Sequence, residues 1–238
     1  MVRIGARVFL AYIAAMHDSS IEAGFVAVKA AIAAAAQRAG RTADEIALVA
    51  VSKQQDEAKI AAALALGHRL FGENRVQEAQ MRWSARRGSL PDLELRLIGP
   101  LQSNKTREAV ALFDVIETVD RDKLAAQLRT EIDRAGKAPR LYVQVNVGEE
   151  PQKAGIGPRD VDAFLDRLRG EFGLAIEGLM CIPPAGEAAG LYFALLREMA
   201  RRNGLARLSM GMSADFREAI RFGATSVRVG SALFGERV

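Results

Sequence analysis

Short apolar runs alternate with amphipathic stretches along most of the chain. A helical pattern over residues 21–39 ends at Gly40, and the apolar runs after it are rich in β-branched and aliphatic side chains. Runs of this kind, bounded by polar residues, are typical of buried strands. They predict eight strands, at residues 47–52, 69–72, 94–99, 115–119, 141–147, 175–181, 207–210 and 226–229.

The stretches between these strands have helical periodicity. Strands and helices that alternate with short connections predict a parallel sheet, and eight such units within 238 residues fit a closed (β/α)8 TIM barrel with an extra N-terminal helix. An open doubly wound sheet is the competing architecture, but it requires a glycine-rich turn after the first strand, and residues 51–54 contain no glycine. The predicted helices cover residues 57–66, 76–86, 105–113, 122–135, 158–169, 188–203 and 213–222.

The chain divides into an N-terminal extension, residues 1–20, and one barrel domain, residues 21–238, because no repeat or linker marks a second domain. Residues 8–15 form an apolar piece behind Arg3 and Arg7, which superficially resembles a signal peptide. A charged helical pattern follows instead, so we expect a poorly ordered extension, with Met16 as an alternative start that N-terminal sequencing can test. No stretch approaches the roughly 20 apolar residues of a membrane helix.

Composition narrows the function classes only slightly. Lys and Arg number 33 against 29 Asp and Glu, and this mild excess favours anionic small molecules over nucleic acid. The single cysteine, Cys181, lies in an apolar stretch and can build neither a disulfide framework nor a cysteine-based metal site, so a cytoplasmic location is expected. The two histidines, His17 and His68, have no metal-ligand spacing and no neighbouring nucleophile.

Lys53 follows the first predicted strand directly. The C-terminal ends of the strands carry the chemistry of α/β barrels, and an amine there can be desolvated and made nucleophilic. A solvated lysine is the ordinary alternative. Lys153 is a second amine near the same end of the barrel, and there a solvated loop lysine is the better interpretation.

The loops after the seventh and eighth strands contain small residues and hydroxyls, and in barrels these loops commonly hold phosphate. Gly211 and Gly230 allow the backbone to approach a ligand closely, whereas Ser213 and Ser231 are expected to open helical segments whose N–H groups favour an anion. An N-cap at Ser213 and a turn at Gly230 would explain the same residues without a ligand.

Two further polar residues belong to the same end of the predicted barrel. Arg228 lies inside the last strand and points opposite to Val227 and Val229, where it is either a fixed cation beside a ligand or the partner of a carboxylate such as Glu73. Asn74 follows the second strand, where capping of the next helix would explain it.

Five motifs occur in order along the chain: Val49-Ala-Val-Ser-Lys53, Phe71-Gly-Glu-Asn74, Ile98-Gly-Pro-Leu-Gln-Ser-Asn-Lys105, Ser209-Met-Gly-Met-Ser213 and Val227-Arg-Val-Gly-Ser-Ala-Leu-Phe-Gly235. Together they resemble the pyridoxal phosphate homeostasis protein family (YggS/PROSC), and the similarity runs from about Ile21 to the end. The resemblance implies a barrel like the N-terminal domain of alanine racemases, with Lys53 holding pyridoxal 5'-phosphate (PLP) as a Schiff base.

The resemblance also assigns the remaining contacts. It implies that the phosphate rests on Ser213, Gly230 and Ser231, that Arg228 faces the pyridine nitrogen, and that Asn74 lines the pocket. A cationic arginine at that nitrogen disfavours ring protonation and weakens the cofactor as an electron sink.

The implied role is intracellular PLP homeostasis by a monomer that stores, protects or delivers the cofactor to PLP-dependent apoenzymes, without catalysis and without nucleic-acid or membrane partners. A PLP-dependent amino-acid racemase or decarboxylase is the alternative, and a lysine-dependent aldolase acting on a sugar phosphate is a third hypothesis. Three residues depart from the family pattern: Gln54 stands where threonine is frequent, Arg75 where tyrosine is common and Arg96 where histidine is frequent.

Overall fold

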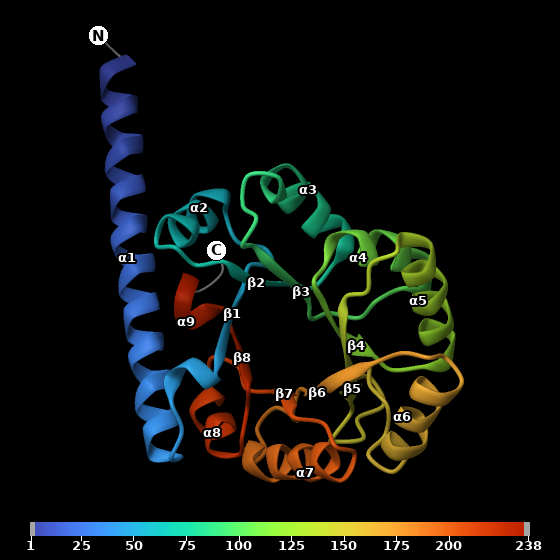
Figure 1. Ribbon diagram of the computed structural model, residues 1–238. Coiled ribbons are helices and arrows are strands. Elements are labelled where there is room, and N and C mark those ends of the chain that lie inside the picture. Colours follow the sequence, from blue (N-terminus) through green and yellow to red (C-terminus); the bar gives the residue numbers. More distant parts are fainter. Residues whose placement is uncertain (1–2, 236–238) are drawn as a thin grey trace.

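Eight parallel strands close into one barrel in the order β1-β2-β3-β4-β5-β6-β7-β8, and the helices surround it (Figure 1). The computed structural model describes residues 3–235, and of residues 3–19 it describes the backbone but not the side chains. The barrel prediction is confirmed, and each predicted strand lies within two residues of its expected bounds. The strands are β1 Ala47–Val51, β2 Leu70–Glu73, β3 Glu94–Leu97, β4 Val115–Val119, β5 Arg140–Val145, β6 Ile176–Cys181, β7 Arg207–Ser209 and β8 Ser226–Val229.

The predicted helices are also present. Two of them begin three residues later than expected, at Val161 and Phe216, and the helix expected at 105–113 is preceded by a 3-10 turn, Ser103–Lys105. The helices are α1 Arg3–Arg38, α2 Glu57–Ala65, α3 Val76–Arg87, α4 Thr106–Leu112, α5 Asp122–Ala135, α6 Val161–Gly170, α7 Ala189–Arg202, α8 Phe216–Arg221 and α9 Ser231–Phe234; a further 3-10 turn covers Ala43–Glu45.

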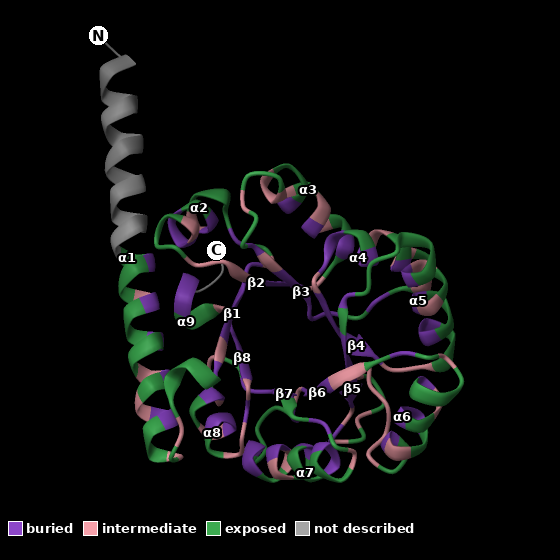
Figure 2. Cartoon of the chain, viewed as in Figure 1, coloured by how far each residue is buried: buried purple, intermediate pink, exposed green. Residues whose placement is uncertain are grey.

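Hydrogen bonds between strands that are not neighbours show which side chains fill the barrel. Ser209 on β7 donates to Glu117 on β4 over 2.5 Å, and a bond between these two strands has to cross the interior. Along β8, Val227 and Val229 join the hydrophobic core, whereas Arg228 between them points inward. Figure 2 shows buried strands at the centre and helices whose outer faces are exposed. The interior therefore holds a buried polar network, and the largest cluster of apolar side chains lies outside the strands.

The first helix packs along the side of the barrel against α2, α8 and α9 (Figure 1). Its segment Ser20–Arg38 is, among the described residues, long and apolar enough to cross a membrane by length and composition alone, so the expectation that no stretch approaches this length is wrong. However, its apolar side chains Ile21, Phe25 and Ile32 are buried against the protein. A Cβ at Gly24 would lie 2.7 Å from the Leu233 carbonyl oxygen, so α1 and α9 are in close contact. This segment thus packs against the outside of the barrel through one apolar face, and its opposite face is exposed.

The predicted extension over residues 1–20 and the alternative start at Met16 stay predictions. Residues 1–2 and the side chains of residues 3–19 lie outside the described part of the chain.

His68 makes the stability of the fold depend on pH. Its ring lies between those of Phe25 and Phe71, with centroid distances of 5.0 and 5.2 Å, and its Nε2 donates to the Leu70 carbonyl over 2.7 Å. Burial lowers the pKa of His68 to about 4, so between pH 6.5 and 4 the unfolded chain binds a proton that the folded chain does not. The stability that the folded protein gains from a neutral His68 is fully present above pH 6.5 and is lost as the pH falls towards 4.

We expect acidification from pH 7 to 4.5 to lower the free energy of unfolding more in the wild type than in His68→Gln, by on the order of 1–2 kcal/mol. Urea denaturation of both proteins at the two pH values measures the difference. Because carboxylates titrate in both proteins, only the difference reports on His68; equal losses would contradict the assignment.

Candidate functional site

The turn after β1 carries Lys53 to the C-terminal end of the barrel, which we call the rim. Lys53 is half-buried and lies two residues beyond Val51, the last residue of β1. The neighbours of β1 are β2, through the pair Val51 and Gly72, and β8, through the pair Ala50 and Val229. Lys53 therefore lies between the loop that begins at Asn74 and the loop that begins at Gly230, as barrel geometry predicts.

The loops after β7 and β8 meet beside Lys53. The Ser213 hydroxyl accepts hydrogen bonds from the backbone N–H groups of Gly230 and Ala232, each at 3.4 Å, and Ser231 follows Gly230 as the first residue of α9. A Cβ at Gly230 would lie 3.5 Å from that of Val51, so this loop lies against the end of β1. The three residues expected to hold phosphate thus come together in one place.

Gly211 lets the first of these loops pack closely. It has a φ of +92°, and a Cβ there would lie 2.6 Å from that of Ala219 in α8. Its carbonyl accepts a hydrogen bond from the Arg228 N–H over 2.9 Å, which fixes the loop on β8. A side chain at this position would be strained and would clash.

Two capping interpretations are wrong. Ser213 does not open a helix, because the Asp215 carboxylate accepts a hydrogen bond from the Met212 N–H over 2.6 Å and closes a turn, after which α8 begins with Asp215 as its N-cap. Asn74 does not cap α3, whose N-cap is Arg75 and has no side-chain cap bond. The capping alternatives therefore explain neither Ser213 nor Asn74.

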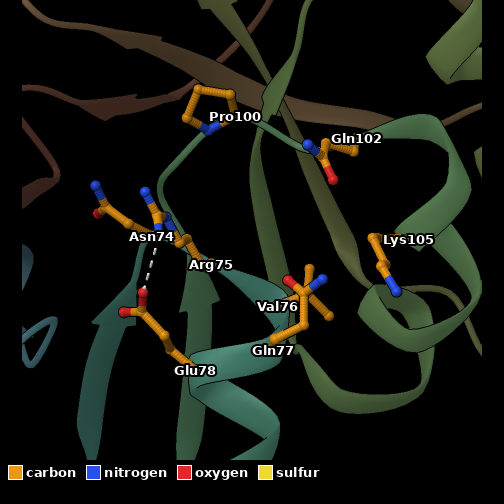
Figure 3. Close-up of a pocket in the computed structure, with 8 residues that line it drawn as sticks. All are labelled: Asn74, Arg75, Val76, Gln77, Glu78, Pro100, Gln102 and Lys105. Atoms are coloured by element: carbon orange, nitrogen blue, oxygen red, sulfur yellow. Dashed lines mark hydrogen bonds and ion pairs between the residues drawn. The ribbon is translucent and has the colours of Figure 1, made fainter.

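Asn74 lines two cavities at the rim. The larger, of about 710 Å³, lies between the loops after β2 and β3, with Asn74 and Arg75 on one side and Gln102 and Lys105 on the other (Figure 3). The smaller, of about 180 Å³, also includes Asn146 and Lys153. A Cβ at Gly99 would lie 2.3 Å from the Asn74 carbonyl oxygen, so the glycine of the third motif is needed for these loops to meet.

Arg228 is fixed inside the barrel beneath the rim. It is 4% exposed, and its two terminal nitrogens donate to the Ser209 hydroxyl over 2.7 Å and to the Cys181 carbonyl over 2.8 Å. The expected alternative, an ion pair with Glu73, is wrong: Glu73 pairs with Arg82 instead. The positive charge of Arg228 is therefore held in place by neutral oxygen atoms.

A buried anion, Glu117, completes this interior network, and no pattern in the sequence marks it as a functional residue. Its carboxylate is fully buried and accepts hydrogen bonds from Ser209 and, over 3.1 Å, from Arg96. Arg96 also donates to Glu94 over 2.7 Å. Burial acts to lower the pKa of Arg96, but Glu117 and Glu94 outweigh it, and the pKa lies above its ordinary value. Arg96 is thus a structural cation of the interior.

The structure also shows the contacts of Lys153 and Arg75 and the environment of Cys181. Lys153 donates to the Pro183 carbonyl over 3.0 Å and pairs with Glu150, which suits a loop lysine. Arg75 is exposed and pairs with Glu78 at 3.5 Å, the dashed line in Figure 3. Burial raises the pKa of the Cys181 thiol to about 12. Among the described residues, no group of histidine, cysteine and acidic side chains could hold a metal ion.

Comparisons with known proteins agree on one family. Residues 27–238 match the family described as "Alanine racemase, N-terminal domain". The chain is 43% identical to the pyridoxal phosphate homeostasis protein of Pseudomonas aeruginosa, covering 92% of this chain and 96% of the relative. It is 39% identical to the protein of that name from Escherichia coli, covering 88% and 94%.

Solved structures give the same picture. PipY of Synechococcus elongatus with PLP bound has a TM-score of 0.73 at 41% identity, covering 86% of this chain and all of that one. An alanine racemase of Clostridium difficile and a lysine/ornithine decarboxylase of Vibrio vulnificus share only the fold, at 15% and 16% identity and TM-scores of 0.64 and 0.65, and this chain covers 52% and 62% of them. By sequence along nearly its whole length, the chain belongs to the pyridoxal phosphate homeostasis protein family.

Proposed function

We propose that this protein binds PLP at the rim of the barrel, through a covalent bond to Lys53, and that it stores, protects or delivers the cofactor without turnover of its own. The observation that carries the proposal is the convergence of the Ser213 hydroxyl with the N–H groups of Gly230 and Ala232, beside the strand that presents Lys53. Hydroxyl and backbone N–H donors of this kind suit a phosphate monoester. Ser231 and Asn74 complete the proposed contacts.

Arg228 supports binding without catalysis. When bound, PLP supplies an electrophilic aldehyde and an electron-withdrawing ring. A guanidinium only donates hydrogen bonds and keeps its proton, so Arg228 opposite the pyridine nitrogen would leave that nitrogen unprotonated and its ring a weaker acceptor of electrons. The bonds of Arg228 to Ser209 and Cys181 hold the charge in the barrel interior, where this effect requires it.

The tyrosines of the described part support the same conclusion. Burial raises the pKa of Tyr142 to about 12, so its phenol stays protonated at neutral pH. Its ring lies 2.7 Å from the position of a Cβ on Gly178, which pairs with the first residue of β7, at the opposite end of the barrel from Lys53. Tyr192 is bonded to Glu187 on the outer surface. Tyr142 is therefore not positioned to move a proton at the rim, and the Tyr192 hydroxyl is already bonded to Glu187.

The physiological partners in this proposal are PLP itself and PLP-dependent apoenzymes in the cytoplasm, served by a monomeric carrier. Ultraviolet-visible spectra of freshly purified protein, before and after borohydride, test the binding. We expect a visible band that borohydride removes, with the reduced adduct found on Lys53 by mass spectrometry. An adduct confined to another lysine would overturn the assignment.

A panel of amino acids, incubated with the PLP-loaded protein, tests the non-catalytic role. We expect neither racemisation nor decarboxylation above the rate of free PLP. Robust turnover of any amino acid would establish the racemase or decarboxylase alternative. Trapping with sugar phosphates in place of PLP would favour the aldolase hypothesis.

A further inference from the structure

The turn that carries Lys53 is strained. Gln54, the next residue, has a φ of +57°, in the left-handed region that residues with a side chain seldom adopt. The Gln55 N–H donates to the Ser52 carbonyl over 3.2 Å and closes the turn around Lys53 and Gln54. A conformation of this kind is energetically costly and persists only where surrounding contacts impose it.

Arg82 of α3 supplies these contacts from behind the turn. Its terminal nitrogens donate to the carbonyl of Ser52 over 2.6 Å and to the carbonyl of Gln55 over 2.8 Å, and so bracket Lys53 and Gln54 from both sides. A planar guanidinium offers two such donors in a fixed geometry. The two carbonyls therefore keep a constant separation, and the turn keeps its shape.

Arg82 is itself held by a buried carboxylate. Glu73 is fully buried, and its Oε1 accepts hydrogen bonds from Arg82 over 2.8 Å, from the Ser52 hydroxyl over 2.7 Å and from the Trp83 indole over 2.9 Å. Burial acts to lower the pKa of Arg82, but Glu73 and Glu57 outweigh it, and the pKa lies above its ordinary value. Glu73 thus fixes both Arg82 and the first residue of the turn.

We propose that Arg82, anchored by Glu73, is a positioning residue that sets the direction of the Lys53 amine towards a bound aldehyde. The inference rests on the proposed function. In that reaction the Lys53 nitrogen forms a C=N bond to the aldehyde carbon, the aldehyde oxygen leaves as water, and nothing is oxidised or reduced. Arg82 acts through the backbone of Ser52 and Gln55, so its effect falls on the covalent step and leaves the phosphate contacts intact.

Two ligands separate a positioning role from a merely structural one. PLP carries the aldehyde, whereas pyridoxine 5'-phosphate has the same ring and phosphate but a hydroxymethyl group that cannot condense with an amine. We expect Arg82→Met to slow formation of the visible band with PLP by roughly tenfold or more, and to change the affinity for pyridoxine 5'-phosphate by less than about twofold. Stopped-flow absorbance and equilibrium titration measure the two quantities.

Two companion variants make the test specific. Arg82→Lys keeps a cation opposite Glu73 but loses the forked donor, so we expect an intermediate rate, and this variant carries the test where Arg82→Met fails to fold. Arg86→Met is the matched control on the same helix: Arg86 bonds to Glu57 and to the Arg82 carbonyl but not to Ser52 or Gln55, and its rate should equal that of the wild type.

Each remaining outcome overturns the inference. If Arg82→Met forms the visible band at the wild-type rate, the positioning role is refuted and the proposed function stands. If the variant loses affinity equally for both ligands, the pocket is generally disrupted, and the positioning role is again refuted while the proposed function stands. A wild type that binds pyridoxine 5'-phosphate but forms no visible band with PLP would defeat the proposed function itself, and the inference with it.

Discussion

Lys53→Ala is expected to abolish covalent retention of PLP, with loss of the visible band and of the borohydride-trapped adduct. Lys53 lies between the Asn74 loop and the loops after β7 and β8, which are proposed to hold the phosphate. The contacts of Ser213, Gly230 and Ser231 remain in the variant, so we expect weaker, reversible binding, with an affinity lower by roughly a hundredfold. Equilibrium dialysis and mass spectrometry of the reduced protein measure both effects.

Lys153→Ala is the matched control. Lys153 is also near the rim, but its amine is held by the Pro183 carbonyl and by Glu150, and we expect this variant to keep most of the visible band. Survival of the band in Lys53→Ala together with its loss in Lys153→Ala would move the cofactor to the other lysine and refute the proposed site.

Glu117→Ala is expected to lower the free energy of unfolding by about 3–5 kcal/mol, the usual cost of removing one partner of a buried ion pair. The variant leaves Arg96 without the carboxylate on its neighbouring strand, and it removes the acceptor of the Ser209 hydroxyl on the far side of the barrel. Arg228 donates to that hydroxyl, so we also expect weaker retention of PLP. Urea denaturation followed by circular dichroism measures the stability.

A surface carboxylate provides the comparison. Glu198 pairs with Arg201 on the exposed side of α7, and Glu198→Ala should leave the unfolding free energy nearly unchanged because solvent screens such pairs. Glu117→Gln keeps the shape of the side chain, so its unfolding free energy should lie between those of Glu117→Ala and Glu198→Ala. A Glu117→Ala variant as stable as Glu198→Ala would show that the interior network contributes little to the fold.

The barrel could be predicted from the sequence because each strand and helix is a local pattern, and because closing eight such units brings the loops after β7 and β8 to the first strand. Lys53, Ser213 and Gly230 are candidates on that basis, and the structure brings them to one end of the barrel. Their convergence needed only the general geometry of the fold.

The partners of buried charges could not be predicted in the same way. Glu117 and Ser209 are 92 positions apart and meet only when the barrel has closed. The alternative that pairs Arg228 with Glu73 is wrong because side chains alternate along a strand. Gly72 faces the interior, where its Cβ would meet Val49 and Ile98, so Glu73 faces α3. Arg82 was missed because an arginine on an amphipathic helix usually lies in solvent.

The pairing of β1 with β8 has a consequence for how the protein matures. Leu48 pairs with Val227 and Val49 with Arg228, so the sheet can close only after the final strand has left the ribosome. Contacts between such distant segments form late in folding. During synthesis Lys53 therefore emerges long before Ser213 and Ser231, so the site proposed for PLP can assemble only on a chain whose last strand is complete.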